Sequence, residues 1–169
     1  MTLPILLKPL TTEMLADLQA MYEASPRYFI TFTGSPVSPI QAANDYNQLL
    51  ESDDRAIMGI FWQNEQLIGS LDFRFQHPAE GILWLGALIL QEELPAPQDE
   101  IGQLALKILA EWLRIATDLT EIRTAVPLNA IDRVRFWQQA GFRLTPELLR
   151  QPIADKQIRF GIFSFAIAR

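Results

Sequence analysis

The sequence predicts an α/β (α+β) fold with a mixed, mostly antiparallel twisted sheet of six to seven strands, flanked by about four helices. Two observations predict it. Three strand-like segments, 55–62, 66–76 and 82–91, follow one another with only short polar turns between them, which indicates an antiparallel meander. A helical pattern over 100–116 then precedes a strand-like segment at 121–126, and a helix crossover of this kind favours a parallel strand pair.

One domain is expected to span the whole chain, 1–169. Its 169 residues are 49% hydrophobic, which suffices for one substantial core rather than two small ones. The chain shows no internal repeat, low-complexity tract or linker-like segment that would divide it.

The chain is predicted to begin with a strand at 5–8, followed by a helix that Thr11 or Thr12 can cap. The helix places Met14, Leu15, Leu18 and Met21 on one face. Ser25 and Pro26 end it, because proline cannot continue a helix from its interior.

The next segment, 27–39, mixes aromatic residues with turn formers and is predicted to be a surface loop. Ser38 and Pro39 then open a second helix. Its apolar residues are Ala42, Ala43, Tyr46, Leu49 and Leu50.

A long amphipathic helix follows the meander, over about 100–116, and Asp99 is placed to cap its start. The apolar residues that fit helical spacing are Ile101, Leu104, Ala105, Ile108, Leu109, Trp112 and Ala116. The strand at 121–126 comes after it.

The segment PLNAIDRVRFWQQAGF reads as a short amphipathic helix that runs into Gly-Phe and a strand. Its apolar face is predicted to hold Ile131, Val134, Trp137 and Ala140. Gly141 ends the helix, because glycine enters the left-handed conformation without a Cβ penalty, and Phe142 begins a strand. Two closing strands are predicted at 142–144 and 158–167.

Composition excludes several classes of function. The net charge is −6 and no two Lys or Arg residues are adjacent, so a nucleic-acid partner is not expected. Without cysteine and with a single histidine, neither disulfides nor a metal site is expected. The N-terminus lacks the pattern of a signal peptide, and the apolar stretch 82–90 is too short to span a bilayer. We therefore expect a cytoplasmic protein that does not bind membranes.

The order of these elements resembles the GNAT (Gcn5-related N-acetyltransferase) superfamily over nearly the whole chain. The resemblance is strongest at LWLGALIL leading into EIGQLALKILAEWL, and at IRTAVPLNAIDRVRFWQQAGF. It implies an acetyl-CoA-dependent N-acetyltransferase that acts on a primary amine of a small molecule or a peptide. Acetyl-CoA would be the co-substrate, and no metal is implied.

The resemblance also implies a cofactor site. Pantetheine would contact the backbone of Leu88, Ile89 and Leu90, and the pyrophosphate would be surrounded by Gln98, Asp99, Glu100, Ile101, Gly102 and Gln103. This loop departs from the family pattern, because Glu100 stands where the first glycine is expected and Pro97 where a basic or amide residue is expected. The carboxylates of Asp99 and Glu100 would oppose bound phosphate. For Gly102, close helix-to-strand packing is the alternative role.

The second unit would contribute Asn129 and Trp137 to the cofactor site. Trp137 stands where many family members carry a tyrosine that protonates the departing thiolate, and an indole cannot serve as this acid. Trp137 can instead be a core residue. Asn129 can instead be the N-cap of its helix.

Asp72 is the first candidate for the general base, because strand alternation puts it on the face opposite Leu71 and Phe73. The alternative is a salt bridge with Arg74, the next residue on the same face. By resemblance, the acceptor pocket would be shaped by Arg27, Tyr28 and Phe29, which can equally be ordinary loop packing.

Two other functions remain open from the sequence. One is a catalytically weak or inactive GNAT-fold module that binds an acyl-CoA or a protein partner, as the loop and Trp137 suggest. The other is a homodimer in which the apolar final strand, IRFGIFSFAIA, pairs with a second copy across a sheet edge.

Overall fold

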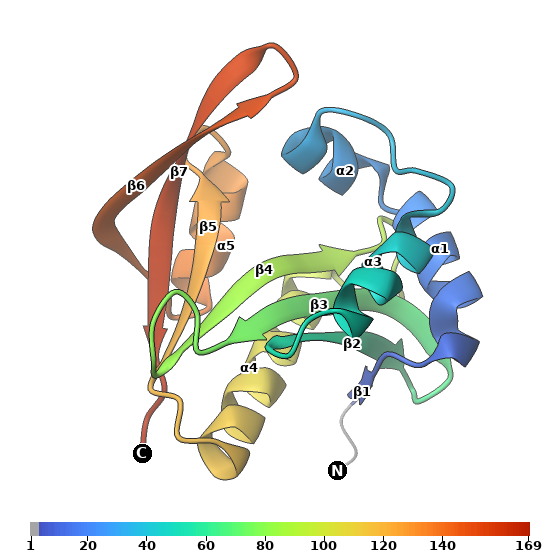
Figure 1. Cartoon of the computed structure of the whole chain (residues 1–169), viewed down its shortest axis with the longest axis horizontal. Coiled ribbons are helices and arrows are strands. Elements are labelled where there is room, and N and C mark those ends of the chain that lie inside the picture. The colour runs from blue at the N-terminus through green and yellow to red at the C-terminus, as the bar shows by residue number, and fades with distance from the viewer. Residues whose placement is uncertain (1–3) are drawn as a thin grey trace.

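The computed structural model describes residues 4–169 (Figure 1). Seven strands form its sheet: β1 Ile5–Pro9, β2 Arg55–Trp62, β3 Gln66–Phe75, β4 Ile82–Leu90, β5 Glu121–Pro127, β6 Arg143–Ile153 and β7 Lys156–Ala166. The helices are a 3-10 turn at Thr12–Met14, α1 Leu15–Glu23, α2 Pro26–Thr33, α3 Gln41–Leu50, α4 Gln98–Ala116 and α5 Ile131–Gln139. None of these helices has both the length and the hydropathy that a bilayer-spanning segment requires.

The seven strands lie in one sheet in the order β1-β2-β3-β4-β5-β7-β6, and only the β4/β5 pair is parallel. The predicted mixed, mostly antiparallel sheet and its crossover are therefore confirmed. Helix α4 lies behind the sheet in Figure 1, and α3 lies in front of it.

Successive side chains along a strand point to opposite faces of the sheet, so the strands contribute to two hydrophobic clusters, one on each face. Ile60 packs with α4 and α5 on one face, whereas its neighbour Phe61 packs with α1, α2 and α3 on the other. Leu88 and Leu90 on β4 also point to the α4 side, and Ile89 between them points to the α1 side. β4 is thus buried on both faces, as a central strand should be.

The sheet opens between β4 and β5. These strands pair only from Ile82 to Trp84 on β4, opposite the first three residues of β5. A bulge follows immediately: Phe73 on β3 pairs with Leu85 and Asp72 pairs with Ala87, which leaves Gly86 as the extra residue. Beyond the bulge β4 keeps its pairing with β3 and diverges from β5, which creates the space for a site.

Segment 27–39, predicted as a loop, instead contains the helix α2. Its boundaries follow the usual rules, because Pro26 occupies the first turn and Gly34 ends the helix at φ 76° in the left-handed region. The tertiary structure holds this short helix in place: a Cβ on Gly34 would lie 2.9 Å from the backbone nitrogen of Ala154 in the β6–β7 turn. Isolated helices of this length are marginal, which is why sequence periodicity missed it.

The final strand predicted at 158–167 corresponds to β7, whereas the strand predicted at 142–144 was too short. β6 extends to Ile153 and forms a long hairpin with β7, and β7 lies between β5 and β6. The apolar final strand is therefore an interior strand, so it cannot pair with a second copy at an edge. The edge strand at this end of the sheet is β6, which exposes Leu144, Leu148 and Leu149.

Two predicted helix caps are also wrong. α4 begins at Gln98 with Pro97 as its N-cap residue, so Asp99 lies inside the first turn. α5 has Ala130 at its N-cap, so Asn129 does not cap it. By contrast, the stop at Gly141 is confirmed, with φ 94°.

Candidate functional site

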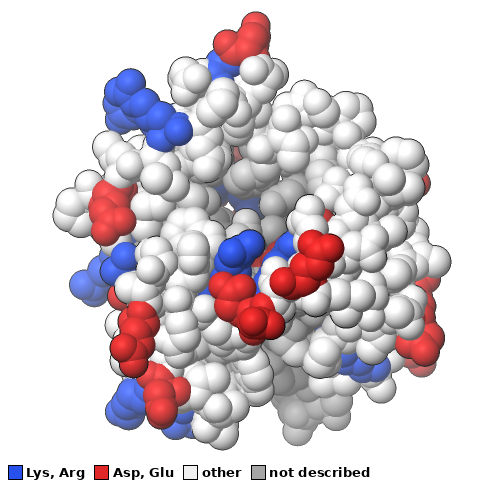
Figure 2. Space-filling model, in the orientation of Figure 1, with Lys and Arg blue, Asp and Glu red and all other residues white. Residues whose placement is uncertain are grey.

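A cleft of about 850 Å³ opens where β4 and β5 diverge. It is bounded by the ends of β4 and the β5–α5 turn, by α2, by the start of α4 and by α5. Figure 2 shows a hollow near the centre of this face, with acidic and basic side chains gathered beside it. The volume lies within the range of about 300–1,000 Å³ that is usual for ligand sites.

The floor of the cleft is apolar. Leu88 and Leu90 of β4 line it, together with Phe136 of α5. Each of them is also part of the core between the sheet and α4. Ile89, predicted with Leu88 and Leu90, has its side chain on the opposite face and does not line the cleft.

Gly102 sits beneath the ring of Phe136. A Cβ at this position would lie 2.9 Å from Cζ of Phe136 and 3.4 Å from Cδ1 of Leu90. Gly102 is buried and does not line the cleft. The absence of a side chain allows α4 to approach α5 and β4 closely, which agrees with the packing alternative that the sequence left open.

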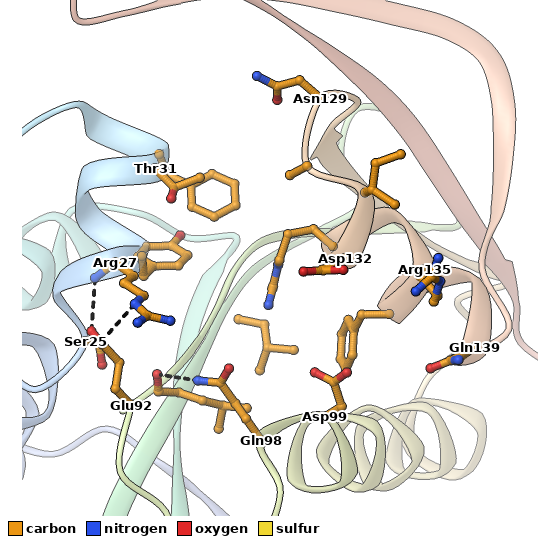
Figure 3. Close-up of a pocket in the computed structure, with 18 residues that line it drawn as sticks. Ser25, Arg27, Thr31, Glu92, Gln98, Asp99, Asn129, Asp132, Arg135 and Gln139 are labelled. Carbon is orange, nitrogen blue, oxygen red and sulfur yellow. Dashed lines mark hydrogen bonds and ion pairs between the residues drawn. The ribbon is translucent and has the colours of Figure 1, made fainter.

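The start of α4 forms one end of the cleft (Figure 3). Gln98 anchors it, since its side-chain amide donates to the carbonyl oxygens of Leu90 and Gln91, each at 3.3 Å. Asp99 lines the cleft across from α5. The other residues predicted around a pyrophosphate do not line it: Glu100, Ile101, Gly102 and Gln103.

Acidic residues dominate this end of the cleft. Segment 91–103 contains four carboxylates and no lysine or arginine. Glu92 pairs with Arg27 of α2, with Nε of the arginine 3.4 Å from Oε1. Asp99 has no basic neighbour on its own turn, so any cation that serves an anion here must come from another element.

Helix α5 presents a different face to the cleft than its sequence predicts. Trp137 is only 5% exposed and packs edge-on against the rings of Phe136 and Phe142 at 5.2 and 4.9 Å. It does not line the cleft, whereas Phe136 does. Ile131, expected in the core, is 65% exposed. Packing against β5 and α4 sets the rotation of α5 about its axis. The spacing of apolar residues within α5 does not predict this rotation.

Asn129 lines the cleft from the β5–α5 turn, as predicted, and in Figure 3 it lies at the end opposite α4. Sequence reasoning missed several polar residues that α5 adds to the same wall: Asp132, Arg133, Arg135 and Gln139. Helical spacing brings these residues toward the same side of α5. The sequence would have predicted them as cleft residues only if the side of α5 that faces the cleft had been known.

Helix α2 supplies the opposite wall. Arg27 and Tyr28 line the cleft, as predicted, and Thr31 and Phe32 one turn later also line it. Phe29 instead points into the core, 5.3 Å from the ring of Tyr22. Recognising α2 as a helix would have predicted Thr31 and Phe32, because they follow Tyr28 by three and four residues.

Tyr28 is the cleft phenol that can hydrogen-bond to a ligand. Burial raises the pKa of its hydroxyl, and the charge of Asp72 raises it further, while Arg133 opposes both. Tyr28 is therefore protonated near neutral pH. It can donate a hydrogen bond, and it cannot act as a base.

Asp72 does not line the cleft and its carboxylate is held by Arg55. Nε of Arg55 donates to Oδ1 at 2.9 Å and Nη2 donates to Oδ2 at 2.6 Å. The salt bridge predicted with Arg74 does not form, and Arg74 lies 4.0 Å from Asp54 instead. Arg55 contacts Asp72 diagonally across the β2/β3 pair. This contact depends on the register of the two strands, which was not predicted from the sequence.

The Asp72→Asn substitution separates the two roles of this residue. A general base predicts a fall in kcat of about 10²- to 10⁴-fold. Because both oxygens accept from Arg55, we expect turnover to stay within about tenfold, while the free energy of unfolding falls by about 1–2 kcal/mol. Thermal unfolding and steady-state rates of the same preparation check this. A large fall in kcat with unchanged stability would restore Asp72 as the base.

At the level of sequence, no family profile and no curated protein matches the chain. Solved structures do match. An acetyltransferase from Thermus thermophilus superimposes with a TM-score of 0.77 at 19% identity, covering 95% of this chain and 96% of that one. The spermidine N-acetyltransferase of Vibrio cholerae, solved in complex with CoA and spermine, gives 0.78 at 12% identity, covering 97% and 96%.

A probable acetyltransferase of the GNAT family from Chromobacterium violaceum also matches, with a TM-score of 0.78 at 14% identity, covering 98% of this chain and 84% of that one. These likenesses span both chains almost completely. They confirm that the chain has the GNAT acetyltransferase fold, as its sequence predicts.

Proposed function

We propose that this protein is an acetyl-CoA-dependent N-acetyltransferase that acts on a primary amine of a small molecule or a peptide. One observation carries the proposal: the cleft lies at the divergence of β4 and β5, with an apolar floor and with the start of α4 at one end. The likeness to acetyltransferase structures supports it.

The residues present fit acetyl-CoA in two respects. Beyond Trp84, the edge of β4 that faces β5 makes no ladder bonds with it, so its backbone groups are available to the amides of a pantetheine arm. Leu88, Leu90 and Phe136 offer apolar contact to the same arm. The carboxylate of Asp99 does not fit a phosphate, so the anionic part of the cofactor needs a compensating cation.

Acetyl transfer forms a C–N bond between a neutral amine and the acetyl group and breaks the C–S bond of the thioester. The amine gives up one proton and the departing CoA thiolate takes one up, directly or through water, so that the products are an amide and a thiol. The bulge at Gly86 turns backbone groups of β4 out of regular pairing, which suits polarisation of a thioester carbonyl. Tyr28 remains protonated and can donate a hydrogen bond to the charge that develops in the cleft. Neither polarisation of the carbonyl nor hydrogen bonding to the developing charge requires a carboxylic acid.

A cationic acceptor is favoured by the charge of the whole protein rather than by that of the cleft. The lining is balanced, with three carboxylates and three arginines: Glu92, Asp99, Asp132, Arg27, Arg133 and Arg135. The protein as a whole carries a net charge of −6, which attracts amines that are protonated in solution. The Vibrio cholerae structure, which holds spermine, is consistent with a small amine here.

The second candidate is a non-catalytic module that binds an acyl-CoA or a protein partner. It is favoured by the place of Asp99 near the expected phosphates and by Trp137, which is buried away from the cleft and supplies no acid.

A thermal-unfolding titration with acetyl-CoA tests the proposed function. At one hundred times the dissociation constant, binding stabilises the native state by about 2.7 kcal/mol. For a chain of this size, the midpoint should rise by roughly 5 to 10 °C. An unchanged midpoint at millimolar acetyl-CoA would refute cofactor binding. If the midpoint rises, CoA release with a panel of amines separates an enzyme from a binding module.

A further inference from the structure

Arg133 is a half-buried cation in the wall of the cleft, and one of its N–H donors has no partner in the described part of the chain. It lies in the first turn of α5 and lines the cleft. Its Nε is buried and has no hydrogen-bond partner within residues 4–169. An arginine is always charged and carries five N–H donors, so burying it without an anion is costly. The site therefore contains a donor group that the protein itself does not satisfy.

The guanidinium lies over the ring of Phe136 on its own helix. Its Cζ is 5.3 Å from the centroid of the Phe136 ring, and that ring packs directly over Gly102 of α4. Burial lowers the pKa of the Arg133 guanidinium, and the nearby charge of Asp99 opposes this effect. Arg133 is thus close to the end of the cleft where the carboxylates gather.

The other cations of the cleft are already committed or exposed. Arg27 is paired with Glu92, and its side chain is 90% exposed. Arg135 is also exposed. Segment 91–103 adds no lysine or arginine. Among the residues that line the cleft, Arg133 is therefore the one cation with a buried N–H donor, Nε, that lacks a partner.

We propose that Arg133 binds the diphosphate of CoA, and so supplies from α5 the cation that the turn before α4 lacks. The proposal rests on the proposed function. The planar guanidinium matches a phosphate with two parallel hydrogen bonds, and it offsets the charge of Asp99 beside the same end of the cleft. A carboxylate at the end of an acyl chain has similar chemistry, so the experiment must separate the two sources.

The test compares four ligands on the Arg133→Gln variant. They are CoA, dephospho-CoA, which keeps the diphosphate, S-acetylpantetheine, which has no phosphate, and succinyl-CoA, which adds a carboxylate at the end of the acyl chain. We expect affinity for CoA and dephospho-CoA to fall on the order of 10- to 100-fold, because a charge-assisted pair is lost. Affinity for S-acetylpantetheine should stay within about threefold of the wild-type value. Arg133→Lys, which keeps the charge but not the fork, should recover part of the loss.

Arg143→Gln is the matched control, because it removes the same charge from an exposed position on β6 outside the cleft. It should change CoA affinity by less than about threefold. Equal CoA affinity in Arg133→Gln and the wild type would overturn the inference and leave the proposed function standing. A loss seen with CoA but not dephospho-CoA, or only with succinyl-CoA, would also overturn it. If the wild type binds no CoA, the proposed function fails as well.

Discussion

Replacing Arg55 with methionine is expected to lower the free energy of unfolding by about 2–4 kcal/mol, because it strands two carboxylates under the N-terminal helices. Arg55 is only 11% exposed and holds both oxygens of Asp72. Its Nη2 also lies 3.9 Å from Oδ1 of Asp45 on α3. Removing one partner of a shielded ion pair leaves an uncompensated charge, which costs more than the pair itself contributed.

The same cluster joins the helices to the sheet. Tyr22 of α1 donates to Oδ2 of Asp45 at 2.7 Å, and burial together with the Asp45 charge raises the pKa of the Tyr22 hydroxyl. Arg55 therefore links α1 and α3 to β2 and β3. These helices also support α2, so loss of the cluster would disturb a wall of the cleft as well as stability.

Thermal unfolding measures the effect of Arg55→Met, and a fall of about 5 to 15 °C in the midpoint is expected for a chain of this size. The matched control is the double variant Arg55→Met with Asp72→Leu, which also removes the stranded carboxylate. It should be more stable than the single variant, giving a coupling energy of about 0.5–3 kcal/mol. A single variant as stable as the wild type would show that the pair is solvated.

Replacing Gly102 with leucine is expected to damage both stability and cofactor binding. The Cβ of the new side chain would lie 2.9 Å from Cζ of Phe136 and 3.4 Å from Cδ1 of Leu90, and the rest of the leucine would need further space. Overpacking of this kind costs typically about 1–3 kcal/mol, partly offset by about 1 kcal/mol of helix propensity. Since Phe136 and Leu90 both line the cleft, a shift of either side chain changes its floor, and affinity for acetyl-CoA should fall on the order of tenfold or more.

A compensating change distinguishes packing from a direct phosphate role for Gly102. Adding Phe136→Ala to Gly102→Leu removes the ring that the leucine displaces, so the double variant should regain part of the stability. Because Phe136 itself lines the cleft, the acetyl-CoA affinity of the double variant is compared with that of Phe136→Ala alone, and the two should agree within about threefold. The midpoint of thermal unfolding and the acetyl-CoA affinity are measured for each of these variants. If affinity stays low while stability returns, Gly102 would serve the phosphate through its backbone rather than through packing.

The candidate site was only partly predictable. Leu88, Leu90, Gln98 and Asp99 were expected at the cofactor cleft and do line it, since the place of a strand end and a helix start follows from local sequence. The α5 residues Arg133 and Phe136 were missed. A helix of nine residues has more than one plausible apolar stripe, and the neighbours of α5 select among them.

The meander, the crossover helix α4 and the stop at Gly141 were predictable from the amino-acid sequence, because each depends on periodicity or backbone freedom within a short stretch. Which residues contact one another depended on the packing of the elements. It turned Trp137 into the core and Phe136 toward the cleft, and it paired Asp72 with Arg55 rather than Arg74. Contacts between distant elements depend on the rotation of each helix about its axis and on the register of paired strands. The spacing of residues along one segment predicts neither of these.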